Sequence, residues 1–318
     1  MSACSIGGAG EDSGKLNRNT VNWKGNFNAV VTPFTRDGDL DEDAFAENVR
    51  LLISEGLDGV VVTGCTGEFW SMSFDERLRC YELALEVADS EAWVIAGTSN
   101  IRTSEVIELS HAAKEAGVDG VMITPPAYVK PSFEEVRQYF LDISSAVQHP
   151  ILMYNVPGRQ GYNLTPRQIA QLGRETECIV AVKQSSPSFI EQIKTIDLAS
   201  SEIRVFVGGS ATRGGPGVLM GADGYVSSVE PQVLGERAIR LYTLASEGRI
   251  DEVRDIQYLS MALDEVLHGD GVGTFPASLK AAMNMLGRPG GYPREPLQAL
   301  NDDELTELRN ILSELDVL

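Results

Sequence analysis

One lysine of this sequence differs from the others in its surroundings. Lys183 directly follows the apolar run Ile179–Val182, whereas the remaining lysines, including Lys280, fall in the tail, in helices or in loops, where a solvated charge is expected. Burial disfavours the ammonium and lowers the lysine pKa, so that a neutral amine becomes available. Such an amine attacks a ketone and forms an imine, which then withdraws electrons from the neighbouring carbon. The alternative is a structural lysine paired with a buried carboxylate such as Glu68.

A tyrosine occupies the corresponding position in the preceding apolar run. Tyr154 lies near the end of Ile151–Val156, and a phenol beside Lys183 would carry protons during imine formation and carbon–carbon bond chemistry. Taken alone, a core tyrosine with a satisfied hydroxyl is the commoner interpretation. The two side chains together favour the chemical interpretation, because both end apolar runs that are consecutive in the chain.

A glycine-flanked turn follows the second apolar run. Cys65 and Thr66 stand between Gly64 and Gly67 there. Successive backbone N–H groups in such a turn suit a carboxylate, although a tight turn without a ligand has the same composition. Tyr128 lies in a proline-containing loop after the fourth run, and by itself it indicates nothing.

The order of elements along the chain predicts how these residues meet. Short apolar runs alternate eight times with amphipathic stretches of helical period, such as residues 41–56, 74–89 and 133–147. Near-continuous apolar strands alternating with helices are typical of an α/β fold of the (β/α)8 TIM-barrel type, in which the active site lies at the carboxyl ends of the strands. The eight runs are Phe27–Phe34, Gly59–Gly64, Trp93–Gly97, Gly120–Thr124, Ile151–Val156, Ile179–Lys183, Arg204–Val207 and Gly224–Ser228.

The domain organisation follows from the same pattern. We expect a flexible N-terminal extension over residues 1–24, the barrel over residues 25–235, and C-terminal helices packed on the barrel over residues 236–318. A doubly wound open sheet is the alternative fold, but the first strand–helix turn has no glycine fingerprint for a dinucleotide.

Charge and composition exclude several classes of function. Lys and Arg number 26 against 46 Asp and Glu, which gives a net charge of −20 and argues against nucleic acid or an anionic membrane surface as partner. No apolar run approaches the about 20 residues that a membrane span needs. The four cysteines and three histidines are dispersed, so we expect neither a metal site nor a disulfide scaffold, and the cytoplasm is the expected compartment.

Together these residues resemble the dihydrodipicolinate synthase/N-acetylneuraminate lyase family of pyruvate-handling class I aldolases. The resemblance lies in Gly64–Glu68, Tyr128, Tyr154–Pro157 and Lys183, in the same order over about residues 25–290. It implies that Lys183 forms an imine with pyruvate or a 2-keto acid. It further implies that Tyr154 transfers protons and that Thr66 with the nearby backbone holds the pyruvate carboxylate. Tyr128 would complete a proton relay from a neighbouring subunit of a homodimer or homotetramer, and the family needs no metal or organic cofactor.

Arg159, Ser210 and Ala211 bear on the second substrate. The resemblance implies that Arg159 binds the carboxylate of an aldehyde, and a guanidinium fork suits a carboxylate well; a surface arginine in a glycine-rich loop is the alternative. Ser210 and Ala211 stand where the neuraminate lyases present acidic residues to sugar hydroxyls, which argues against a polyhydroxylated sialic acid. Cys65 departs from the family's hydroxyl at the relay position, and a thiol is a poorer hydrogen-bonding bridge.

The sequence therefore predicts a Schiff-base lyase or synthase acting on pyruvate and an aldehyde, similar to dihydrodipicolinate synthase. Cys65 and Thr66 are assigned to the catalytic group with Lys183, and Gly64, Gly67 and Ser210 to substrate binding. A 2-keto-3-deoxy sugar-acid aldolase or dehydratase of the same superfamily is the first alternative. The others are a phosphate-binding barrel enzyme, built on a glycine-rich loop over residues 208–215, and a non-catalytic barrel.

Overall fold

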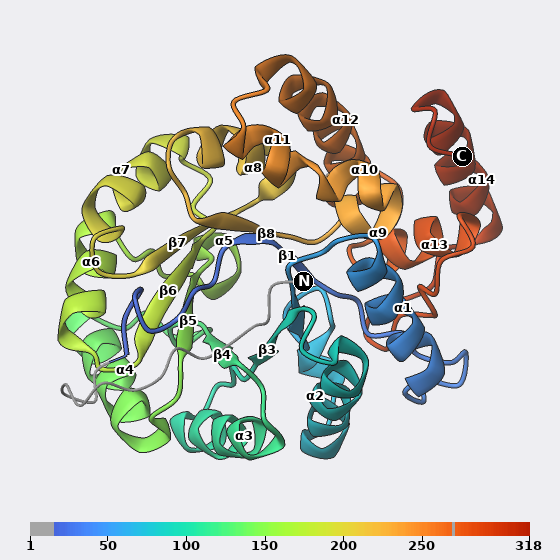
Figure 1. The fold of residues 1–318 in the computed structure, drawn as a ribbon. Coiled ribbons are helices and arrows are strands. Elements are labelled where there is room, and N and C mark those ends of the chain that lie inside the picture. The colour runs from blue at the N-terminus through green and yellow to red at the C-terminus, as the bar shows by residue number, and fades with distance from the viewer. Residues whose placement is uncertain (1–15, 269–270) are drawn as a thin grey trace.

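The computed structural model describes residues 16–268 and 271–318, which form a closed eight-stranded barrel. All strands are parallel and pair in chain order, and the last strand pairs with the first, so the alternative of an open doubly wound sheet is wrong (Figure 1). Every strand is buried almost along its whole length, as expected for strands covered on both faces. The strands are β1 Gly25–Ala29, β2 Gly59–Val62, β3 Trp93–Gly97, β4 Gly120–Ile123, β5 Ile151–Asn155, β6 Ile179–Gln184, β7 Arg204–Gly208 and β8 Gly224–Ser227.

The first strand is the one whose position differs most from the prediction. It ends at Ala29, whereas the apolar pattern predicts a strand over Phe27–Phe34. Val31 turns away from the sheet ladder, because its N–H donates to the Gln232 side chain at 2.9 Å. Pro33 has no N–H to donate to a ladder, so the extended segment cannot continue as a barrel strand.

Helices cover the outside of the barrel, and their first turns explain where several of them begin. Ser73 and Ser132 each form a capping box with the glutamate three residues later, which fixes the starts of the helices that follow. The helices of this part are α1 Glu42–Ser54, α2 Phe74–Ala88, α3 Thr103–Ala116, α4 Phe133–Val147, α5 Pro157–Gln160, α6 Pro166–Glu175, α7 Phe189–Ala199 and α8 Ser210–Leu219, with a 3-10 turn η1 at Phe69–Ser71.

The glycine-rich segment after β7 is a helix, so the predicted loop over residues 208–215 is wrong. Helix α8 begins at Ser210, and its glycines lie against packed neighbours. Gly215 faces Val253, and Gly217 faces Val207, so these residues let the helix approach the sheet and α12 (Ile250–His268) closely. Packing, not a phosphate cradle, accounts for the glycines on these faces.

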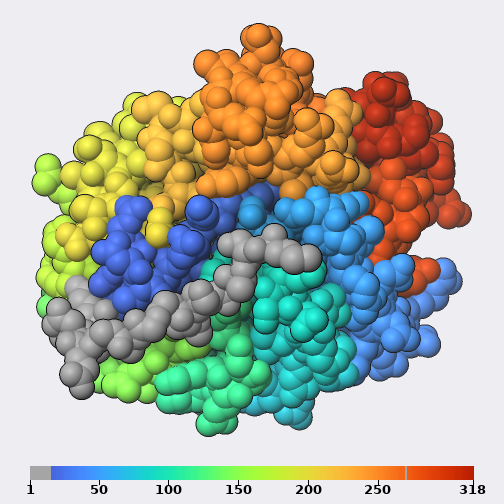
Figure 2. Space-filling view, in the orientation of Figure 1, coloured from blue at the N-terminus to red at the C-terminus, as the bar shows by residue number. Residues whose placement is uncertain are grey.

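The C-terminal helices extend along one side of the barrel. Figure 2 shows them in orange and red, next to the blue segment that contains α1, and Arg288 bonds Glu55 at the end of α1 through two contacts of 2.7 and 2.8 Å. Helices α13 and α14 share an apolar cluster that includes Val31 and Val229. These helices are α9 Glu230–Leu234, α10 Glu236–Ile239, α11 Leu241–Ser246, α12 Ile250–His268, α13 Ala277–Met285 and α14 Asp302–Glu314.

The amino-terminal end of the barrel is closed by an aromatic side chain. Trp23 is 0% exposed, and its ring lies so close to Gly120 that a Cβ there would fall 2.4 Å from it. The sequence predicts a flexible extension over residues 1–24, of which residues 1–15 lie outside the described part of the chain. Residues 16–24 differ from that prediction because they are bound to the barrel: Arg18 pairs with Asp223 at 3.1 Å.

In residues 16–268 and 271–318, no helix combines the length and the apolar character that a membrane crossing demands.

Replacement of Trp23 by alanine tests the role of the closed barrel end. We expect Trp23→Ala to lower the free energy of unfolding by about 3–5 kcal/mol, because a fully buried indole leaves a cavity behind. Urea unfolding measures the loss. Trp70, 42% exposed, is the matched control, and Trp70→Ala should change the stability by less than about 1 kcal/mol. Equal effects of the two substitutions would show that Trp23 contributes no more than a surface tryptophan.

Candidate active site

A cavity of about 240 Å³ opens at the carboxyl ends of the strands. It draws side chains from the turn after β2, from the ends of β5, β6 and β8, and from helices α5, α8 and α12. Its size suits a small metabolite. The residues lining it are Cys65, Thr66, Tyr154, Arg159, Lys183, Ser185, Gly209, Ser210, Ala211, Arg213, Val226, Ser228, Glu230, Asp264, His268 and Phe275.

Lys183 lies at the centre of this arrangement. It is 6% exposed and stands in register with Tyr154 on the neighbouring strand, its Nζ 4.3 Å from the centroid of the tyrosine ring. The pKa of Lys183 is lowered to about 8, mainly by burial and also by the nearby Arg159, while Cys65 and Glu230 oppose the shift. Among the described residues, no carboxylate forms a salt bridge with Lys183. The amine is therefore dry, partly deprotonated near neutral pH, and next to a phenol.

Tyr154 is held in the same dry environment. Burial raises the pKa of its phenol, Cys65 acts in the same direction, and a hydrogen bond with Ser185 opposes the shift. The phenol consequently keeps its proton at neutral pH and is able to donate it.

The turn after β2 has a strained backbone. Thr63 and Glu68, on either side of Gly64–Gly67, have φ values of 51° and 54°, which are unusual for residues other than glycine. Thr63 Oγ1 contacts the Gly97 carbonyl at 3.1 Å, and a Cβ at position 97 would lie only 2.6 Å from the Thr63 carbonyl oxygen. This close approach requires glycine at position 97. The turn buries Thr66 at the cavity wall, and such strain persists only where the surroundings impose it.

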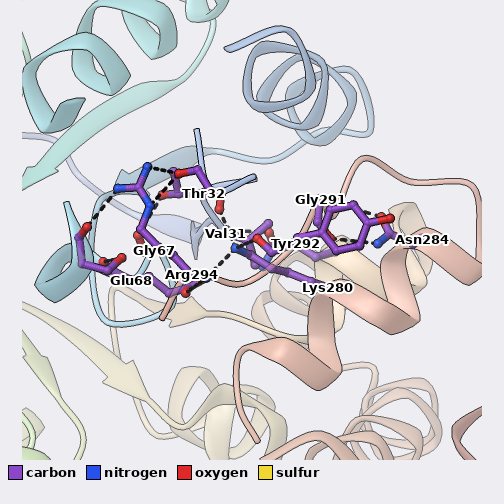
Figure 3. Close-up of polar contacts among 12 residues, drawn as sticks. Val31, Thr32, Gly67, Glu68, Lys280, Asn284, Gly291, Tyr292 and Arg294 are labelled. Carbon is purple, nitrogen blue, oxygen red and sulfur yellow. Dashed lines mark hydrogen bonds and ion pairs between the residues drawn. The ribbon is translucent and has the colours of Figure 1, made fainter. Parts of the chain in front are cut away.

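A buried ion pair with a residue near the C-terminus holds the strained turn after β2 in place. Figure 3 shows Lys280 of α13 reaching toward Glu68, Thr32 and Tyr292. Its Nζ bonds the Glu68 carboxylate and donates to the carbonyls of Thr32 at 2.6 Å and Tyr292 at 2.8 Å. The other carboxylate oxygen of Glu68 accepts the Arg294 N–H at 3.0 Å. The segment from α13 to residue 294 thus holds the residue that ends the turn.

This pair corrects two expectations drawn from the sequence. Glu68 is bound to Lys280, so it is not the partner of Lys183. Lys280 is fully buried and not a solvated helix charge, and burial lowers its pKa while the Glu68 carboxylate opposes the shift. The sequence does contain a sign that Lys280 is buried. Lys280 is the one charged residue of α13, a nine-residue helix that is otherwise largely apolar.

Three other predicted residues do not line the cavity. Gly64 and Gly67 frame the turn but contribute no surface to the cavity, and Gly67 is held by its carbonyl, which accepts the Thr32 hydroxyl at 2.8 Å. Tyr128 is 94% exposed, with a left-handed φ of 71°, in the loop after β4. The structure does not bring Tyr128 to the cavity of its own chain.

Two guanidinium groups border the cavity. Arg159 extends from α5, its guanidinium carbon 5.9 Å from the centre of the Phe275 ring. Arg213 of α8 lies over Gly209, and burial lowers its pKa. Although the chain carries a net charge of −20, this side of the cleft favours an acid.

Sequence reasoning did not identify three acidic or basic residues of the cavity. Glu230, just after β8, accepts the Ser210 hydroxyl at 2.7 Å. Asp264 and His268 come from α12, with Oδ1 and Nδ1 2.7 Å apart, and the imidazole stacks on Phe275. The sequence pattern does not predict that Asp264 and His268 reach the cavity, because α12 follows the eight strand–helix repeats and meets the cavity only through contacts between distant segments.

The sequence matches the Dihydrodipicolinate synthetase family over residues 22–315. The chain belongs to this family. The resemblance and the barrel fold predicted from the sequence are thereby confirmed. A 4-hydroxy-tetrahydrodipicolinate synthase of Methanococcus maripaludis is 33% identical over 295 residues, which cover 93% of this chain and 99% of the relative.

Solved structures agree with this assignment. The dihydrodipicolinate synthase of Aquifex aeolicus superposes with a TM-score of 0.85 at 29% identity, over 93% of this chain and 99% of that chain. YagE of Escherichia coli K12, a prophage protein of the dihydrodipicolinic acid synthase family solved in complex with pyruvate, gives a TM-score of 0.86 at 25% identity, with the same coverage.

Unfolding measurements test whether the Glu68–Lys280 pair stabilises the chain. We expect Lys280→Met to lower the free energy of unfolding by about 3–5 kcal/mol, because the Glu68 carboxylate would stay buried without its cation. The double variant Glu68→Gln/Lys280→Met should recover part of the loss, since no uncompensated charge remains. Urea unfolding of both variants, with Lys194→Met on the exposed face of α7 as control, measures the effect. If Lys280→Met is as stable as Lys194→Met, the pair does not hold the turn.

Proposed function

We propose that this chain is a Schiff-base enzyme that joins pyruvate to a carboxylate-bearing aldehyde or cleaves the product, as a 4-hydroxy-tetrahydrodipicolinate synthase does. The observation that carries the proposal is the buried amine of Lys183, 4.3 Å from the ring of Tyr154 in a small cavity. The names of the relatives and the pyruvate bound to YagE support the choice of the keto acid. The fit of Arg159 to a second carboxylate supports the choice of aldehyde.

The chemistry begins with addition of the neutral Lys183 amine to the C2 carbonyl of pyruvate. The carbinolamine loses water and becomes a protonated imine, which lowers the barrier to loss of a proton from C3. The resulting enamine carbon bonds to the aldehyde carbon, and the aldehyde oxygen takes up a proton. Water then cleaves the imine and returns the amine. Tyr154 is the group placed to move these protons, because its buried phenol keeps its hydrogen at neutral pH.

The other assigned residues bind and orient the two substrates. Thr66 and the N–H groups of its turn would hold the pyruvate carboxylate, and Arg159 the carboxylate of the aldehyde. Cys65 takes the relay position beside Tyr154. Tyr128 is exposed and does not line the cavity of its own chain, which fits a tyrosine that serves the cavity of a second copy, so we propose a homodimer or homotetramer as the active form.

Imine trapping with pyruvate and borohydride tests the role of Lys183. We expect added mass at Lys183 in the native chain and none at that position in Lys183→Ala, with Lys194→Ala trapping as the native chain does. Because Lys183 has a pKa lowered to about 8, the trapping rate should fall about tenfold for each pH unit below that value and level off above it. Equal trapping in Lys183→Ala, or a rate that keeps rising to the pKa of an exposed lysine, would contradict the assignment.

Substitution of Arg159 tests the binding of the aldehyde. We expect Arg159→Gln to raise the KM for aspartate semialdehyde by about 10-fold to 100-fold, because charged hydrogen bonds contribute about 1.5–3 kcal/mol, and to leave the KM for pyruvate nearly unchanged. Steady-state kinetics with both substrates measures the split. Arg167→Gln, on the exposed face of α6, is the control. A change confined to the KM for pyruvate would assign Arg159 to the keto acid instead.

A further inference from the structure

We propose that Cys65 and Lys183 form a reversible modification site, in which a peroxide oxidises the thiol to a sulfenic acid and the Lys183 amine then bonds to its sulfur. The product is a sulfur–nitrogen cross-link, a sulfenamide, which joins the turn after β2 to the end of β6. The proposal goes beyond the proposed function and rests on it only for the effect on catalysis, because the cross-link would withdraw the amine that binds pyruvate.

Cys65 is the thiol that a small oxidant reaches. Among the described residues it is the one cysteine that is not buried, and it lines the same cavity as Lys183. Cys80 is 0% exposed, and burial raises the pKa of its thiol, while Cys178 is 3% exposed. Because oxidation of a thiol requires access, peroxide would act selectively on Cys65.

Lys183 is the nucleophile that the oxidised sulfur would meet. It is 6% exposed, its Nζ forms no hydrogen bond or ion pair with another described residue, and it lies over the ring of Tyr154. After burial, the charge of Cys65 is the largest influence on the pKa of Lys183, so the two side chains are close neighbours in the cavity of about 240 Å³. An amine with a pKa of about 8 is partly neutral at neutral pH and then has the free electron pair that a new bond needs.

The surroundings of Cys65 favour a bond to nitrogen over a disulfide. Cys65 packs against the apolar cluster inside the barrel that contains Tyr154, whereas Cys80 and Cys178 belong to a separate cluster. A sulfenic acid condenses with a thiol or with a nitrogen, and in the described part of the chain no second thiol lines the cavity. The amine is therefore the available partner.

The other nitrogen-bearing side chains of the cavity are less suited to this bond. Arg159 and Arg213 keep their protons at any ordinary pH, and a guanidinium has no free electron pair to offer. The imidazole of His268 is engaged on the α12 side, with Nδ1 2.7 Å from Asp264 and the ring stacked on Phe275. These contacts leave Lys183 as the nitrogen that can attack the sulfur.

The two steps balance with hydrogen peroxide as the oxidant. Peroxide transfers one oxygen atom to Cys65 Sγ, the sulfur supplies the two electrons, and one water leaves. The Lys183 nitrogen then attacks the sulfur, the sulfur–oxygen bond breaks, and the hydroxyl group leaves as water with a proton from the amine. Two molecules of a small thiol reverse the reaction, because they return the Cys65 thiol and the Lys183 amine and become a disulfide themselves.

The cross-link would have two consequences for the enzyme. A nitrogen bonded to sulfur is no longer a primary amine, so it cannot form the protonated imine with pyruvate. At the same time the sulfur would be protected from the sulfinic and sulfonic acids, which small thiols do not reduce. Oxidation at this site would therefore stop the enzyme reversibly.

Peptide mapping of the peroxide-treated chain tests the site. We expect a linked pair of peptides that contain Cys65 and Lys183, lighter by two hydrogens than the separate peptides. Trapping of pyruvate at Lys183 with cyanoborohydride should fall by the same fraction of chains, and added thiol should restore it. Cys178→Ala, at a buried cysteine, should form the link as the native chain does. Cys65→Thr should retain, after peroxide, the trapping that it shows before treatment.

Lys183→Ala tests whether the amine captures the sulfenic acid. In this variant we expect dimedone, a reagent for sulfenic acids, to label Cys65 more strongly than in the native chain. Equal labelling in both chains, or added oxygen at Cys65 of the native chain without linked peptides, overturns the proposal. These two measurements on the native chain decide the question even if a variant fails to fold.

Pyruvate trapping before oxidation separates failure of this proposal from failure of the proposed function. If the untreated native chain traps pyruvate at Lys183 and peroxide yields no link, the modification site is wrong and the Schiff-base function stands. If the link forms and the untreated chain traps no pyruvate, the proposed function is wrong and the modification site stands.

Discussion

The fully buried ion pair between Glu68 and Lys280 is the interaction on which the cleft depends most. Taking two charges out of water is unfavourable, and it is offset here by close contact and by the carbonyls of Thr32 and Tyr292 and the N–H of Arg294. The pair fastens the end of a turn whose backbone is strained at Thr63 and at Glu68 itself. The C-terminal helices are therefore part of the site's architecture. Of these helices, only α9, through Glu230, and α12 contribute side chains to the cavity wall.

The electrostatics of the cleft differ from those of the whole molecule. The chain has a net charge of −20, yet Lys183, Arg159 and Arg213 gather around one small cavity. Charges in a cleft with low-dielectric walls act more strongly than charges spread over a solvated surface. The net charge thus describes the surface, whereas the positive charge in the cleft comes from three side chains near the carboxyl ends of β5, β6 and β7.

Most of the barrel was predictable from the sequence because its signals are local. Apolar runs and amphipathic periods located all eight strands, and the order of these strands placed Lys183 and Tyr154 side by side. The parts that escaped prediction depend on contacts between distant segments. Lys280 meets Glu68 across 212 positions, and Glu230 meets Ser210 only after β7 and α8 have packed on β8. The glycines within residues 208–215 are typical of a loop. That glycines of this segment and its continuation instead allow close packing is visible only once Val207 and Val253 are known to lie beside them.

The bond between Ser210 and Glu230 joins the segments that follow the adjacent strands β7 and β8. Tyr154, Lys183 and Thr66 reach the same cavity from β5, β6 and the turn after β2, so its wall is assembled from separate strand–helix units. Such modularity makes the scaffold evolvable, because the residues after one strand can be exchanged while those after the other strands keep their surroundings.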